Sequence, residues 1–135
     1  MMNIDTLSNE IITAAHEVHQ TIGPGLHEAE YQECLCYELD KRNVSFERQK
    51  PLPMLQKYKG QTLDCGYTLE LVVEDAVVVE IKYCEKIESI HKSQLQTFLK
   101  LSGFHRGLLM NFNVPDLDDG IVRIENNQKK LGRMS

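Results

Sequence analysis

The chain has 135 residues, of which 41% are hydrophobic and 26% charged, and its formal net charge is −5. This length predicts one domain with a sizeable core, and the composition excludes intrinsic disorder as the default. The negative charge excludes a broad basic surface that coats nucleic acid nonspecifically, but it leaves room for a small acidic metal site with a basic rim. The N-terminus does not have the pattern of a secretory signal, and no apolar run approaches the roughly 20 residues that span a bilayer. We therefore expect a soluble, cytoplasmic protein.

The predicted elements alternate between helical and extended segments. Apolar residues at helical spacing predict a first helix over residues 5–21, which ends at the GPG sequence of residues 23–25. Further helices are predicted over residues 28–42 and 90–101. Apolar runs predict strands over residues 44–49, 54–58, 62–73, 76–82, 106–111 and 121–125, with a turn at Lys59-Gly60 and a polar loop at 116–120.

This order of elements indicates an α/β fold in which helices cover both faces of a mixed sheet. We expect a single domain over residues 1–125 and a flexible C-terminal tail over residues 126–135. An exposed edge strand would permit a homodimer. The four cysteines lack the spacing of zinc or iron–sulfur ligands, so buried reduced thiols are expected.

The sequence TLELVVEDAVVVEIK, residues 68–82, contains the strongest predicted strand pair. If residues 74–76 form the turn, residues whose numbers sum to 150 face each other, and Glu70 lies opposite Glu80. One face then carries Glu70, Glu80 and Lys82. The other face is entirely apolar and consists of Leu69, Leu71, Val73, Val77, Val79 and Ile81.

Two opposed carboxylates repel each other unless a positive group lies between them. Their side chains begin about 5 Å apart, and oxygen ligands are those that Mg²⁺ prefers. Lys82 shares their face and could assist the attack of water on a phosphodiester. The alternative interpretation is a half-solvated polar face with a weak cross-strand ion pair.

Glu70 is followed ten residues later by E-I-K and then by a helix that opens with H-K-S-Q. This pattern resembles the PD-(D/E)XK nuclease superfamily. Residues 25–31, GLHEAEY, fit the GxxExxY pattern that names a small bacterial family within it. The segments YKG, LELVVED, VVVEIK, QLQTFLK and GLLMNF are also similar to that family, so the resemblance covers roughly residues 5–125.

The resemblance implies a restriction-endonuclease-like three-layer α/β/α sandwich with a metal-dependent phosphodiesterase site. It implies that Glu70 and Glu80 are the two acids, which bind Mg²⁺ or Mn²⁺, and that Lys82 is the catalytic lysine. Gln94 matches a glutamine that supports the site in some branches, and Glu28 is a candidate further metal ligand.

The chain departs from the family pattern at the first acid. The family usually has aspartate at the position of Glu70 and often arginine at that of Thr68; Asp64 is a candidate substitute acid. His91 could contact a phosphate or be an ordinary surface histidine. Tyr31 is expected either to pack in the core or to take part in the active site.

The residues and the resemblance together lead to two alternative hypotheses for the function. The first is a metal-dependent nuclease that acts on DNA or RNA, and the second is a catalytically degenerate nuclease-fold module that binds nucleic acid or a protein partner. A local cluster of basic residues could hold a nucleic-acid backbone or be a solvated face; it consists of Lys41, Arg42, Arg48 and Lys50.

Overall fold

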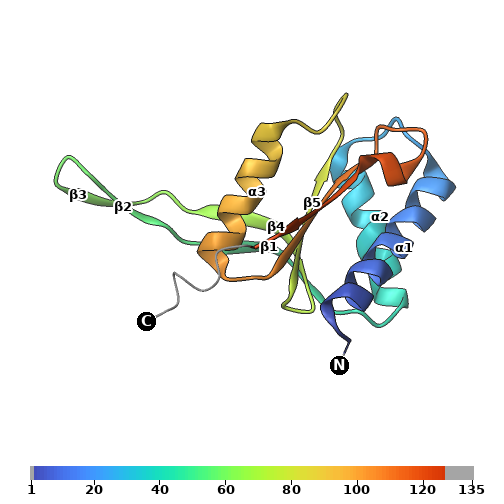
Figure 1. The fold of residues 1–135 in the computed structure, drawn as a ribbon, viewed down its shortest axis with the longest axis horizontal. Helices are drawn as coiled ribbons and strands as arrows, with labels where there is room; N and C mark the ends of the chain where they lie inside the picture. The colour runs from blue at the N-terminus through green and yellow to red at the C-terminus, as the bar shows by residue number, and fades with distance from the viewer. Residues whose placement is uncertain (1, 127–135) are drawn as a thin grey trace.

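Five strands form the central sheet in the order β1-β4-β5-β6-β7. The structure is a computed structural model that describes residues 2–126 (Figure 1). β5 and β6 are parallel, whereas the other neighbouring pairs are antiparallel, so the sheet is mixed as predicted. The strands are β1 (Phe46–Leu52), β2 (Leu55–Tyr58), β3 (Gln61–Asp64), β4 (Tyr67–Val73), β5 (Val77–Lys82), β6 (Arg106–Asn111) and β7 (Ile121–Glu125).

Helices cover both faces of the sheet. α1 (Ile4–Ile22) and α2 (Glu28–Lys41) lie on one face and α3 (Ser89–Ser102) on the other (Figure 1). A short 3-10 helix, Leu117–Gly120, precedes β7. The arrangement confirms the predicted three-layer α/β/α sandwich. No helix in residues 2–126 is long and apolar enough to cross a membrane.

Two apolar clusters fill the spaces between the layers. The larger joins α1 and α2 to the sheet through Leu71, Val79 and Ile81, and the smaller joins α3 to the sheet through Val72 and Val78. Because side chains alternate along a strand, a sheet that is covered on both faces needs apolar residues at consecutive positions. The continuous run of valines and leucines in β4 and β5 meets that need.

The predicted register of the β4–β5 hairpin is confirmed by the pairs Leu71–Val79, Val72–Val78 and Val73–Val77. The predicted apolar face needs one correction. Leu69 packs in the cluster beneath α3, whereas Leu71 packs on the α1–α2 side. The strand therefore changes face between these two residues, at Glu70.

The predicted strand over residues 62–73 is two strands, because the chain leaves the extended conformation at Cys65-Gly66. β3 pairs with β2 in a separate two-stranded hairpin, which projects from the body of the protein (Figure 1). Its turn is the predicted Lys59-Gly60, where both residues have positive φ angles. Cys65 is exposed, which corrects the expectation of buried thiols at this position.

The predicted C-terminal tail begins at Asn126. The Asn126 side chain donates hydrogen bonds to the carbonyls of Leu99 and Phe104, so this residue is held against the end of α3. Residues 127–135 of that prediction lie outside the described part of the chain.

Candidate active site

Glu70 and Glu80 lie where the paired part of β4 and β5 ends. The backbone N–H of Glu70 donates to Oε2 of Glu80 at 3.1 Å, and the backbone N–H of Ile81 donates to Oε1 of Glu70 at 2.9 Å. Each carboxylate thus accepts a main-chain N–H of the opposite strand. The structure therefore brings the two predicted acids together across the hairpin.

An irregularity in β1 accompanies the change of face at Glu70. Arg48 pairs with Leu71 and Lys50 with Leu69, but Gln49, between them, has a φ of 50° and no partner in the ladder. A non-glycine residue at positive φ is uncommon and locally breaks the regular pleat. The break leaves Glu70 free to turn toward β5 and α2.

Burial dominates the electrostatics of both acids. Glu80 is 9% exposed, and desolvation raises its pKa from 4.5 to about 7, with the charge of Glu70 adding to the increase. Desolvation also raises the pKa of Glu70. The nearby Lys82 opposes both increases but does not cancel them. The site thus concentrates negative charge that the chain itself neutralises incompletely.

α2 contributes two side chains to this region. Oε2 of Glu28 accepts the backbone N–H of Tyr83, directly after β5, at 3.1 Å. Nε2 of Gln32, one helical turn beyond Glu28, donates to Oε2 of Glu70 at 2.7 Å. Sequence reasoning missed Gln32; its spacing of four residues from Glu28 on a helix was the available signal.

The GxxExxY segment has a structural explanation. Gly25 has a φ of 111°, which favours glycine, and allows the sharp entry into α2. The hydroxyl of the fully buried Tyr31 donates to the Gly23 carbonyl at 2.7 Å, and its ring stacks on Phe112 with 4.4 Å between ring centroids. Tyr31 therefore packs, and together these residues fix Glu28 at the start of the helix.

Three other predicted candidates lie outside the pair of acids. His91 accepts the backbone N–H of Glu88 and so caps α3, while Gln94 is exposed on α3 and lines a shallow pocket with Tyr67. Asp64, at the end of β3, accepts the backbone N–H groups of Met54 and Gly66. It holds the base of the hairpin, which corrects the suggestion that it replaces Glu70.

The basic cluster around the start of β1 is balanced by acids. Arg42 pairs with glutamates of α1 and α2, Arg48 pairs with a glutamate of α2, and Lys50 pairs with a glutamate of β1 itself. The remaining member, Lys41, lies over the ring of Tyr37. These contacts favour the interpretation of a solvated face.

The chemistry of the acids fits a hard divalent cation. Within residues 2–126, no three His, Cys, Asp or Glu side chains are grouped closely enough to form a metal site by themselves. The two carboxylates do supply oxygen ligands in a partly buried setting, and Mg²⁺ commonly takes only one or two protein carboxylates and keeps several waters. A cation there would oppose the desolvation and the smaller like-charge repulsion that together raise both pKa values.

A family model for the PD-(D/E)XK nuclease superfamily matches residues 5–124. The chain belongs to the PD-(D/E)XK nuclease superfamily. The chain is similar to the crystal structure of SSO0001, with 15% sequence identity and a TM-score of 0.47. The match covers 88% of this chain and 77% of the SSO0001 chain. The comparison with curated proteins found no similar sequence.

Membership in the PD-(D/E)XK superfamily confirms the predicted superfamily and gives the chain a nuclease-type domain. Nucleases of this superfamily generally use divalent metal ions and bind nucleic acid. The narrower GxxExxY assignment stays a prediction.

Proposed function

We propose that this chain is an active nuclease of the bacterial GxxExxY branch, which hydrolyses phosphodiester bonds of nucleic acid with Mg²⁺ or Mn²⁺ in the cytoplasm. The proposal is supported above all by the buried Glu80 and the half-buried Glu70, which meet across β4 and β5 beside Lys82. Keeping two repelling acids in a partly buried position costs stability, and a cation-binding role explains that cost.

Each side chain of the site would have a distinct role in catalysis. Glu70 and Glu80, with Glu28 nearby, would hold the cation, which when bound polarises a phosphoryl oxygen and lowers the pKa of water. Gln32 would position Glu70 through its hydrogen bond. The Lys82 ammonium would stabilise negative charge that develops on the phosphate during attack.

The two remaining predicted residues, Gln94 and His91, would act from α3, outside the pair of acids. Gln94 is exposed on α3, and its amide would be free to contact a bound strand. His91 would act by fixing the first turn of α3, where its ring accepts the Glu88 N–H at 2.9 Å.

A second function is supported by the departure at the first acid. Glutamate at position 70 is one methylene longer than the usual aspartate, and its two oxygens already accept hydrogen bonds from Ile81 and Gln32. Mg²⁺ tolerates little distortion of its octahedral coordination. A chain that binds nucleic acid or a protein partner without cleaving would have the same fold.

Cleavage assays separate the two functions. Labelled DNA and RNA, single- and double-stranded, would be incubated with the protein and Mg²⁺, Mn²⁺ or EDTA. We expect metal-dependent cleavage that is lost in Glu80→Ala and Lys82→Ala but kept in Lys86→Ala, a matched change of an exposed lysine in the next loop. Cleavage that persists in Glu80→Ala would refute the site. Absence of cleavage, together with no thermal stabilisation by either metal, would favour the inactive module.

A further inference from the structure

Charge is distributed unequally between the two helical layers. α1 carries three acidic residues and α2 five, whereas Lys41 is the only lysine in either helix. α3, on the opposite face, has two lysines, Lys92 and Lys100, and no acidic residue. An overall acidic protein thus presents a locally basic helix on one side only.

The β2–β3 hairpin is the second acid-poor element. Lys59 lies in its turn, and Lys57 lies in β2, two residues earlier. The one acid of the hairpin, Asp64, accepts two backbone N–H groups at the base. The Lys59 ammonium lies 5.4 Å from the centroid of the Tyr58 ring, which holds this charge at the tip.

The lysines of these two elements differ in their surroundings from the basic residues near β1. Among residues 2–126, Lys57, Lys59, Lys92 and Lys100 form no ion pair, whereas the arginines and Lys50 near β1 are paired with glutamates. Four unpaired positive charges therefore remain available to an anionic partner.

The root of the hairpin lies against α3. Tyr67, the first residue of β4, packs on Phe98 of α3 with 4.9 Å between ring centroids, and Leu52 packs against the same cluster. Figure 1 shows the hairpin projecting from this region. The two basic elements therefore meet at the α3 side of the sheet.

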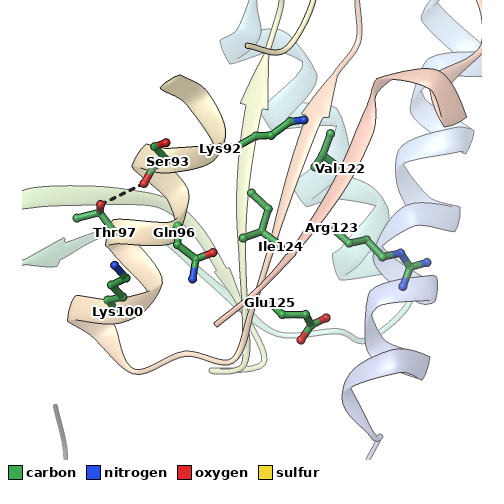
Figure 2. A pocket seen from close by; sticks show the side chains of 9 residues that line it. All are labelled: Lys92, Ser93, Gln96, Thr97, Lys100, Val122, Arg123, Ile124 and Glu125. Atoms are coloured by element: carbon green, nitrogen blue, oxygen red, sulfur yellow. Dashed lines mark hydrogen bonds between the residues drawn. The ribbon is translucent and has the colours of Figure 1, made fainter. Parts of the chain in front are cut away.

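α3 also borders a groove whose lining has two unpaired lysines and one acid, Glu125, which is paired with Arg106. The groove, of about 550 Å³, lies between α3 and the edge strand β7 (Figure 2). Lys92 and Lys100 lie two turns apart along its α3 side, and Arg123 on β7 points away from it toward α1, where it binds Asn9. The hydroxyls and amide between the two lysines are those of Ser93, Gln96 and Thr97.

We propose that the β2–β3 hairpin and the outer surface of α3 together bind duplex DNA, with the four lysines contacting phosphates. A two-stranded β-ribbon fits the B-DNA major groove, which is about 12 Å wide, whereas the deep, narrow major groove of A-form RNA excludes it. This inference rests on the proposed nuclease function and names its substrate.

The length of the hairpin sets the region of DNA that it reaches. Gly60 at the turn is ten residues from Glu70. At about 3.3 Å per residue the tip lies at most about 33 Å from that acid, which equals about ten base pairs. The hairpin would hold the duplex up to one helical turn from the scissile phosphate.

Binding in EDTA tests this surface without requiring catalysis. Fluorescence anisotropy with a duplex of about 30 base pairs, titrated at several salt concentrations, would compare wild type with Lys57→Ala/Lys59→Ala and Lys92→Ala/Lys100→Ala. Each double variant should bind the duplex at least about tenfold more weakly. The negative slope of log K against log salt should become smaller in magnitude by about 2. Lys41→Ala/Arg48→Ala, which removes one positive charge from α2 and one from β1, should change neither value.

The outcomes distinguish this inference from the proposed function. If the wild-type protein does not cleave but the lysine variants lose DNA affinity, the proposed DNA-binding surface is supported and the proposed nuclease function is refuted. Cleavage with unchanged DNA affinity in both lysine variants would overturn the surface alone. An equal effect in the control variant, or an equal loss of affinity for duplex RNA, would also overturn it.

The exposed apolar side chains of the hairpin provide one more test. Leu55 is 70% exposed and could instead meet a second copy of the chain. Sedimentation that shows a dimer abolished by Leu55→Ser, together with unchanged DNA affinity in the lysine variants, would assign the hairpin to self-association and overturn the inference.

Discussion

Replacing Glu80 by glutamine should stabilise the protein at neutral and alkaline pH. In the folded chain burial raises the pKa of Glu80 to about 7, whereas an exposed glutamate in the unfolded chain has a pKa near 4.5. Between these two values the folded state binds the proton more tightly than the unfolded state does. The free energy of unfolding therefore falls as pH rises from 4.5 to 7 and stays low above 7.

The size of the effect follows from the pKa difference. Each pKa unit corresponds to 1.36 kcal/mol, so ionised Glu80 costs about 3 kcal/mol of stability above pH 7. A protein of this length loses about 0.3 kcal/mol per degree near its melting temperature, so the difference amounts to about 10 °C in Tm. Glu80→Gln keeps an oxygen that can accept the Glu70 N–H but has no charge to desolvate.

Chemical denaturation of Glu80→Gln and wild type between pH 4 and 8.5, without divalent metal, measures this difference. The variant should match wild type below pH 4.5 and exceed it by up to about 3 kcal/mol at pH 8. Glu85→Gln, a change at an exposed glutamate, should follow wild type throughout. Equal stabilities of Glu80→Gln and wild type at pH 8 would refute the reasoning, since they would show that the folded protein pays no penalty for that charge.

Three further predictions concern the site and the core. Mg²⁺ or Mn²⁺ at about ten times its Kd should raise the stability of wild type by about 1.4 kcal/mol above pH 7, as measured by thermal shift against EDTA. Gln32→Ala should lower cleavage about 10- to 100-fold and move the acidic limb of the pH–rate profile upward, because Glu70 loses a donor that lowers its pKa; an unchanged profile would contradict the positioning role. Asp5→Asn/Glu125→Gln should cost about 3 kcal/mol in urea denaturation, because it leaves the buried charge of Arg106 unpaired, whereas Arg106→Met should cost about 1 kcal/mol; the reverse order would contradict this account.

The sequence predicted most of the local structure because local rules govern it. Helical periodicity and the GPG segment gave the first helix to within one residue at each end, and the short apolar run Arg106–Asn111 is β6 as predicted. The register that places Glu70 opposite Glu80 followed from the segregation of charged and apolar residues, and the pairs up to Leu71–Val79 confirm it.

The sequence was less informative where the chain departs from regular geometry. It gave one strand over residues 62–73, because alternation continues through Cys65-Gly66 and nothing local reveals that β3 leaves the sheet. The change of face between Leu69 and Leu71 escaped prediction for a related reason. It accompanies the positive φ of Gln49 on a neighbouring strand, and glutamine is not a residue that signals such a conformation.

By itself, the sequence thus determined which residues form helices and strands, that two acids meet across a hairpin, and which superfamily the chain resembles. Only the tertiary structure decided that Gln32 reaches Glu70 from α2, that burial raises the pKa of Glu80, and that unpaired lysines gather on α3 and the projecting hairpin. The physical reason is that periodicity and turn chemistry act between near neighbours in the chain. Desolvation, ion pairing and the grouping of surface charge depend on distances between segments that only the packed fold sets.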